Sequence, residues 1–348
     1  MTQPYYKQVD LENTKKLREL IADLPSFVGT FFRGIDQQTA SRTKISYAYD
    51  LRIFFQYLKE NNPIVARADM KSLTVDLLDQ ITALDLEEYM EYLKYYTKDG
   101  TEYTNSERGI KRKLSCLKTF YNYFYQKEMI RTNPAALVKL PKMHEKAIIR
   151  LEADEVSRLL DQVEQGDKLT KGQRAFHEQT KERDLAIMTL LLGTGIRVSE
   201  CVGLDIGDVD MKEDAILIHR KGGKEAILYF GNEVEEALLP YLAVRKEIEA
   251  VEGHENALFL SMQKKRMSVR AVENLVKKYT RTAAPLKKIT PHKLRSTYGT
   301  SLYKETGDIY LVASVLGHSD VNTTKKHYAA MDEEQRRRAR NAVHLRKD

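Results

Sequence analysis

Four short sequence patterns in the second half of the chain carry residues that could bind an anion or transfer a proton. The clearest is TPHKLR, which ends at Arg295. Thr290 can cap a helix that Pro291 starts, and His292 and Arg295, three residues apart, then share one helix face. Both lie near the helix N-terminus, where backbone N–H groups without helical partners form a natural anion site.

The other three patterns each place one or two reactive side chains at the end of an expected element. GTGIRVSE places Arg197 just after a strongly apolar helix, and RKGGKE places Lys221 at the mouth of a hairpin. LGHSDVNTTKKHYA places His318 at a helix break and Tyr328 ten residues later. Each pattern alone is also typical of a surface ion pair, a turn or a structural helix contact, and Tyr328 is only one of 20 tyrosines.

Composition narrows the class of protein. The chain has 348 residues, 57 Lys and Arg against 50 Asp and Glu, and a net charge of +7, which permits a polyanionic partner without establishing one. Two cysteines, Cys116 and Cys201, exclude a disulfide scaffold and a cysteine-rich zinc site, and we expect buried thiols. With no signal peptide and no apolar run of about 20 residues, we expect a cytoplasmic protein.

The elements that must hold these residues are mainly helical. In the second half, an apolar helix over 184–192 precedes Arg197, and residues 215–230 read as two short strands around Gly222 and Gly223. Later helices are expected from about 233, 268, 291, 308 and 320. The stretch 165–181 is polar and reads as a surface loop.

The first half reads as helices over 39–60, 86–97 and 106–128, the second of them capped by Asp85. The last helix has an apolar face and a second, cationic face without acids. Such a face suits contacts with DNA phosphates, although an ordinary solvated face has the same appearance. The candidate DNA-contacting residues are Arg108, Lys111, Ser115, Lys118 and, in the basic stretch that follows, Lys139 and Lys142.

Together and in this order, the patterns resemble the tyrosine recombinase family of site-specific DNA recombinases, also called phage integrases. RKLSCLKTFYNYF, which begins at Arg112, is similar to the DNA-facing helix of the family's first domain. The resemblance covers about residues 39–330. It implies a two-domain, C-shaped DNA clamp with a helical, SAM-like core-binding domain over 1–140, a basic linker over 141–150, and a mainly α catalytic domain with a small antiparallel sheet over 151–348.

The resemblance also implies a role for each site residue. Arg197 and Arg295 match the two arginines that clamp the scissile phosphate. His292 and His318 match further hydrogen-bond donors or proton-transfer groups, and Lys221 matches a general acid for the leaving 5′ oxygen. Tyr328 matches the nucleophile. The acidic residue Glu200 matches a supporting residue that holds Arg197.

These roles imply a metal-free and cofactor-free reaction. Cleavage proceeds through a 3′-phosphotyrosine intermediate, and strand exchange through a Holliday junction. The cationic side chains replace the charge of a metal ion, and the phosphotyrosine conserves the bond energy for ligation.

Residues 1–38 look too short for the separate arm-binding domain of many integrases, which favours a Xer-like enzyme that resolves chromosome dimers. An integrase or excisionase of a phage, transposon or conjugative element remains the alternative, and a type IB topoisomerase a remote one.

The implied partners are double-stranded DNA with inverted half-sites, and further copies of the chain, which form a dimer on one site and a homotetramer on paired sites. The tail after Tyr328 is expected to dock on a neighbouring protomer, with a frayed, basic tail that touches DNA as the alternative. An accessory DNA translocase or directionality factor is a further candidate partner. We expect no membrane contact and a nucleoid-associated location.

Overall fold

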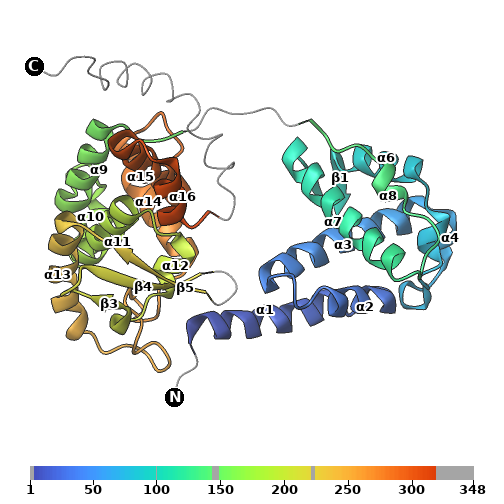
Figure 1. The fold of residues 1–348 in the computed structure, drawn as a ribbon, viewed down its shortest axis with the longest axis horizontal. Coiled ribbons are helices and arrows are strands. Elements are labelled where there is room, and N and C mark those ends of the chain that lie inside the picture. Colours follow the sequence, from blue (N-terminus) through green and yellow to red (C-terminus); the bar gives the residue numbers. More distant parts are fainter. Residues whose placement is uncertain (1–3, 99, 143–148, 221–223, 319–348) are drawn as a thin grey trace, which may run out of the picture. The chain divides into compact units, whose positions relative to one another are not determined.

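The computed structural model describes residues 4–98, 100–142, 149–220 and 224–318. The chain divides into two compact units, Met1–Lys146 and Ala147–Asp348 (Figure 1). Most of both units is helical, and the sheets are small and antiparallel. The expected mainly α fold with a small antiparallel sheet is therefore confirmed. Within the described ranges, no helix is both long enough and apolar enough to cross a membrane.

The first unit consists of helices and one two-stranded hairpin. Its elements are α1 (Tyr5–Ile21), α2 (Ser26–Gly34), α3 (Ser41–Asn61), α4 (Pro63–Arg67), the 3-10 turn Met70–Ser72, α5 (Leu77–Gln80), α6 (Ala83–Tyr92), β1 (Tyr95–Lys98), β2 (Thr101–Thr104), α7 (Glu107–Gln126) and α8 (Pro134–Leu137).

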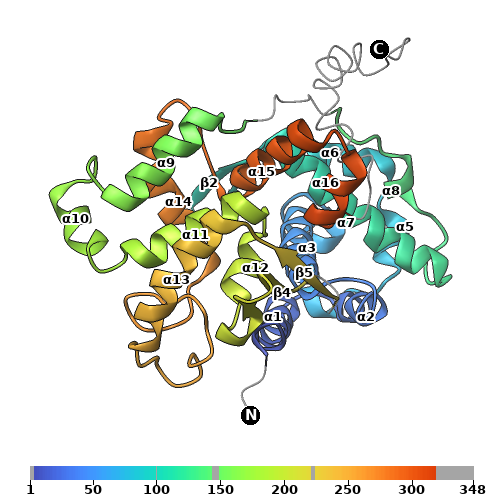
Figure 2. The same cartoon turned by 60° about the vertical axis from the view of Figure 1, so that its left-hand side comes forward.

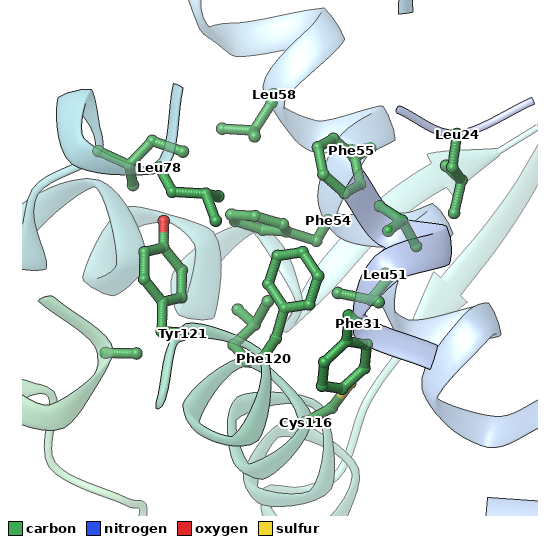
Figure 3. Packing of buried hydrophobic residues seen from close by; sticks show 14 of the residues in the cluster. Leu24, Phe31, Leu51, Phe54, Phe55, Leu58, Leu78, Cys116, Phe120 and Tyr121 are labelled. Atoms are coloured by element: carbon green, nitrogen blue, oxygen red, sulfur yellow. The ribbon is translucent and has the colours of Figure 1, made fainter. Parts of the chain in front are cut away.

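Aromatic side chains from α2, α3 and α7 form the core of this unit (Figure 3). The ring of Phe120 on α7 meets Phe31 edge to face, with 5.0 Å between centroids, and Phe54 on α3 meets Tyr89 in the same way at 5.2 Å. Aromatic pairs of this geometry contribute beyond the area they bury. The core therefore fixes which face of α7 points outward.

Helix α6, which corresponds to the helix expected over 86–97, is shorter than the sequence indicates. It starts after the cap Thr82, whose hydroxyl accepts from the backbone of Asp85, so Asp85 lies inside the first turn and is not the cap. It ends at Tyr92, and the expected last turn is strand β1, paired with β2. The rings of Tyr92, Tyr96 and Tyr103 stack along this hairpin. Aromatic cross-strand packing favours strand over helix here.

The second unit surrounds the apolar helix α11 and carries a three-stranded sheet in the order β3-β4-β5. Its elements are α9 (Ala153–Gln165), α10 (Lys171–His177), α11 (Lys181–Thr194), α12 (Val198–Gly203), the 3-10 turn Ile206–Asp208, β3 (Val209–Asp210), β4 (Ala215–His219), β5 (Glu225–Tyr229), α13 (Asn232–Lys246), α14 (Val269–Ala283), α15 (Pro291–Thr306) and α16 (Ile309–Leu316).

Helix α11 packs against α9, α13 and α15, so it lies at the centre of this unit (Figure 2). Because it has neighbours on several sides, its middle turns are almost entirely buried, as its continuous apolar run predicts, and none of its residues is fully exposed.

The segment expected to be a surface loop contains a helix, α10, that is anchored to this core. The buried His177 at its end lies 3.0 Å from the hydroxyl of Tyr279, which in turn donates to the buried carboxylate of Asp184 at 2.9 Å. Lys278 pairs with the same carboxylate. The expectation of a loop was wrong because a polar sequence can still form a helix when a few of its residues find buried partners.

Candidate active site

The turn between α11 and α12 positions Arg197. Gly195 ends α11 in the left-handed conformation with φ +62°, and Arg197 directly precedes α12. The carboxylate of Glu200, 8% exposed, accepts the backbone N–H of Arg197 at 3.0 Å and its Nη1 at 2.7 Å. One buried carboxylate therefore holds both the backbone and the guanidinium of Arg197.

The thiol of Cys201, next to Glu200, lies in the apolar interior behind this turn. Burial raises the pKa of Cys201 to about 12, and the charge of Glu200 adds to the effect. The carboxylate of Glu200 lies against this apolar interior, whereas the side chain of Arg197 is 38% exposed, so Glu200 holds the arginine at the edge of the interior.

Arg295 lies in the second turn of α15 and is buried, with 6% exposed. Its Nη1 donates to the carbonyl of Gly195 at 2.5 Å, and its Nη2 donates to the carbonyl of Leu316. Backbone carbonyls at a helix end carry partial negative charge, which stabilises a buried cation. Arg295 thus joins the turn before Arg197 to the end of α16.

The C-terminus of α16 brings these parts together. Gly317 ends the helix with φ +58°, and the N–H of His318 donates back to Ala313 at 2.9 Å. The carbonyl of Gly317 accepts Nη2 of Arg197 at 2.8 Å. Consecutive carbonyls, of Leu316 and Gly317, therefore receive the two arginines, and the chain runs directly into the half-buried His318.

The structure thus brings Arg197, Glu200, Arg295 and the backbone of His318 into one place. His292 lies on the first turn of α15, three residues before Arg295, and is exposed. Lys221 and Tyr328 lie outside the described residues, as does the tail after Tyr328.

The candidate DNA-contacting residues lie in the first unit. On α7, the buried residues form one face, and Arg108, Lys111, Ser115 and Lys118 lie on the exposed or half-buried remainder. The Ser115 hydroxyl donates to the carbonyl of Lys111 at 2.8 Å, and Nζ of Lys118 lies 3.4 Å from the carbonyl of Ala136. Lys139 and Lys142 are exposed in the segment after α8.

The sequence patterns did not predict a role in the site for three residues, Gly195, Gly317 and Arg220. Gly195 and Gly317 each allow a left-handed helix end where an arginine meets a carbonyl, and Arg220 reaches the same helix end from β4. The glycines carried a usable signal, since each follows a helix and precedes a candidate residue. Arg220 adjoins Lys221 but carries no local signal, because its contact is 95 residues away in sequence.

No group of three or more His, Cys, Asp or Glu side chains in the described ranges is arranged to hold a metal ion. The charged groups gathered at α16 are guanidiniums and one carboxylate. They suit an anion held by hydrogen bonds.

Comparison with known proteins identifies the family. The model of the phage integrase family matches residues 149–335, and that of the phage integrase SAM-like domain matches residues 23–140. The chain therefore belongs to the phage integrase family. It is a Xer-like site-specific tyrosine recombinase.

Among its relatives is the tyrosine recombinase XerC of Caldanaerobacter subterraneus subsp. tengcongensis, 35% identical over 305 residues, covering 85% of this chain and 80% of the relative. The tyrosine recombinase XerS of Streptococcus uberis is 29% identical over 358 aligned positions, with 92% and 96% covered.

Solved structures agree at the level of the fold. The XerH recombinase in a post-cleavage complex with its palindromic difH substrate has a TM-score of 0.63 and 20% identity, covering 83% of this chain and 76% of that one. A lambda integrase dimer bound to a COC′ core site has a TM-score of 0.60 and 16% identity, with 87% and 94% covered.

Proposed function

We propose that the protein binds double-stranded DNA at inverted half-sites and exchanges strands through 3′-phosphotyrosine intermediates and a Holliday junction. In the cell it resolves chromosome dimers. The observation that carries the proposal is the convergence of Arg197 and Arg295 on consecutive carbonyls at the end of α16, with Glu200 as the carboxylate that holds Arg197. Such a cluster of preorganised donors suits a phosphodiester whose negative charge grows during the reaction.

The arginines act on the nonbridging oxygens of the scissile phosphate. Each guanidinium has five N–H donors in a fixed plane, so it can keep its carbonyl contact and still offer hydrogen bonds to an anion. Because both cations are held by backbone carbonyls and Glu200 before DNA arrives, little reorganisation is needed at the moment of reaction. His292 and His318 supply further donors to the same phosphate.

The bond changes balance without a cofactor. The Tyr328 oxygen bonds to phosphorus and gives its proton to an imidazole, His292 or His318, while the bond from phosphorus to the 5′ oxygen breaks and that oxygen takes a proton from Lys221. One phosphodiester is exchanged for another, so the free 5′ hydroxyl of a partner strand can later reverse the step. A tyrosine hydroxyl, with an ordinary pKa of about 10, is a weak nucleophile. Cationic stabilisation of the phosphate is therefore the main contribution required of the site.

The first unit supplies DNA contacts that are independent of sequence. Arg108, Lys111, Ser115 and Lys118 project from α7 away from the aromatic core, and Lys139 and Lys142 extend the basic surface along the segment that joins the units. Phosphate contacts of this kind fix the position of a protein on DNA and weaken as salt rises.

Assembly follows the same proposal. A dimer occupies one site with inverted half-sites, and a homotetramer holds two paired sites, with the tail after Tyr328 docking on a neighbour. The structures of XerH with its palindromic substrate and of a lambda integrase dimer on a core site support, by analogy of fold, the binding of a dimer to one site with inverted half-sites. The protein acts in the cytoplasm at the nucleoid, with a DNA translocase or directionality factor as its accessory partner.

Covalent capture tests the function. The protein is incubated with fragmented genomic DNA of its source and denatured, and the attached DNA ends are sequenced. Tyr328→Phe is expected to abolish the adduct because the phenolic oxygen is the nucleophile. Tyr310→Phe, which changes an exposed tyrosine (72%) on α16, is the matched control and should leave the adduct intact.

The position of the ends separates the candidate roles. Ends at one chromosomal inverted repeat support dimer resolution, whereas ends at the borders of a mobile element make the protein an integrase. Scattered ends indicate topoisomerase activity. An adduct that survives in Tyr328→Phe contradicts the assignment of the nucleophile.

A further inference from the structure

Three arginines from three different elements meet at the end of α16. Arg220, after β4, donates Nη2 to the carbonyl of Val315 at 3.1 Å. Arg295 donates to Leu316, and Arg197 donates to Gly317 at 2.8 Å. Three consecutive carbonyls therefore each receive a different guanidinium. The family patterns account for two of these arginines and leave Arg220 without a role.

Arg220 is closely fitted to the end of the helix. Its guanidinium lies against Gly317, where an added Cβ would lie 2.2 Å from Nη1 and 2.4 Å from Cζ. The left-handed φ of +58° thus favours glycine at position 317, and a larger residue there would also push the guanidinium of Arg220 away from the helix end. The backbone N–H of Arg220 donates to the carbonyl of Lys224 at 2.7 Å, so the side chain is anchored to the β4–β5 hairpin.

The remaining part of the side chain is enclosed. Nε of Arg220 is buried and has no acceptor among the residues that the structure describes. The contact therefore consists of one hydrogen bond and the close packing of the planar guanidinium against Gly317. A lysine ammonium lacks this planar surface, so it cannot reproduce the contact.

We propose that Arg220 is a positioning residue for strand cleavage, a role that rests on the proposed function. It ties the end of β4, directly before Lys221 in sequence, to the C-terminus of α16. In doing so it fixes the carbonyls of Leu316 and Gly317, which orient Arg295 and Arg197. It also fixes the position of the backbone directly before His318. Arg220 acts through these residues and does not itself bind the phosphate.

The first test measures the contact without DNA. The thermal unfolding midpoint is compared for the wild type, Gly317→Ala, Arg220→Ala and the double variant. Part of the cost of Gly317→Ala is the clash with the guanidinium, so its drop in Tm should be at least halved in the Arg220→Ala background. Equal drops in both backgrounds overturn the proposed contact, whatever reaction the protein performs.

The second test measures the role. Single-turnover cleavage of the captured site, as a nicked half-site oligonucleotide, is compared for Arg220→Met, Arg220→Lys and the exposed control Lys212→Met. Both Arg220 variants should slow cleavage about tenfold to a hundredfold, the range expected for a misplaced catalytic group. DNA affinity and its salt dependence should match those of Lys212→Met.

Two results overturn the role. Full activity of Arg220→Lys means that charge alone suffices. A salt slope for DNA binding that falls by about one in Arg220→Met but not in Lys212→Met makes Arg220 a phosphate ligand. Failure of the proposed function looks different, because wild-type protein then forms no adduct while the coupling between Arg220 and Gly317 in unfolding persists.

Discussion

At the residue scale, the geometry of the site depends on one carboxylate, Glu200, that accepts two hydrogen bonds from the same arginine. Glu200 accepts from both the backbone and the guanidinium of Arg197, and a carboxylate is needed because each of its oxygens receives a donor. Its neighbour Cys201 is fully buried, so water cannot replace a lost partner on that side. Without Glu200, the side chain of Arg197, 38% exposed, would lose its carboxylate anchor and keep its hydrogen bond to the carbonyl of Gly317.

We therefore predict that Glu200→Gln lowers both stability and activity. The amide keeps one acceptor but places an NH2 group against a donor, so the free energy of unfolding should fall by about 1–3 kcal/mol. Cleavage should slow at least tenfold at unchanged DNA affinity, because Arg197 loses its orientation. Urea unfolding and single-turnover cleavage measure the two effects. Glu213→Gln, which alters an exposed glutamate, is the control, and equal behaviour of the two variants would contradict the prediction.

At the element scale, helix ends assemble the site. The turn after α11, the first turns of α15 and the C-terminus of α16 meet because a residue with positive φ ends α11 and α16 sharply. Gly195 is closely packed by side chains, since an added Cβ would lie 2.5 Å from Cδ1 of Tyr298 and 2.9 Å from Cδ2 of Leu316. Its carbonyl also accepts Arg295.

Gly195→Ala should therefore be costly. The left-handed backbone costs a non-glycine residue about 1–2 kcal/mol, and overpacking adds about 1–3 kcal/mol. We expect loss of stability in urea unfolding, together with slower cleavage in the fraction that folds, because Arg295 is displaced. Gly172→Ala on α10 is the matched control, since its added Cβ meets nothing within 4 Å and should leave stability unchanged or slightly raised. A Gly195→Ala protein as stable as this control would refute the argument.

At the scale of the whole molecule, each of the two units has its own buried thiol. Burial raises the pKa of Cys116 in the first unit well above its ordinary value, and raises that of Cys201 in the second to about 12. The unfolded chain ionises both near pH 9, where the folded chain keeps both protons. The unfolded state thus binds fewer protons as pH rises, and stability falls.

We predict that the free energy of unfolding is unaffected by the thiols below about pH 8 and falls between pH 8 and 10 by about 1 kcal/mol per thiol. Urea unfolding at a series of pH values measures this loss. The double variant Cys116→Ala and Cys201→Ala is the comparison, and its curve should be flatter over that range, although its buried tyrosines still ionise at higher pH. Curves of equal slope would show that the thiols contribute nothing.

Much of the fold could be predicted from local sequence. The apolar stripes of α3 and α7 and the continuous apolar run of α11 each indicate a helix, because side chains at helical spacing must share a face. The sequence reading failed at the β1–β2 hairpin and at α10. The first is stabilised by tyrosines stacking on α6, and the second by His177 contacting Tyr279 more than 100 residues away. The partner of His177 is not visible in a local window, whereas the tyrosines are close in sequence but stack only once the chain has turned back as a hairpin.

The sequence by itself determined the family and the identity of the candidate site residues, because their types and order are specific even when each pattern alone is common. Tertiary structure alone decided how the arginines are held. The carbonyls of Val315, Leu316 and Gly317 receive side chains from three elements that are distant in the chain. Backbone carbonyls look alike in every sequence, so only the packing of α16 against its neighbours shows which of them an arginine meets.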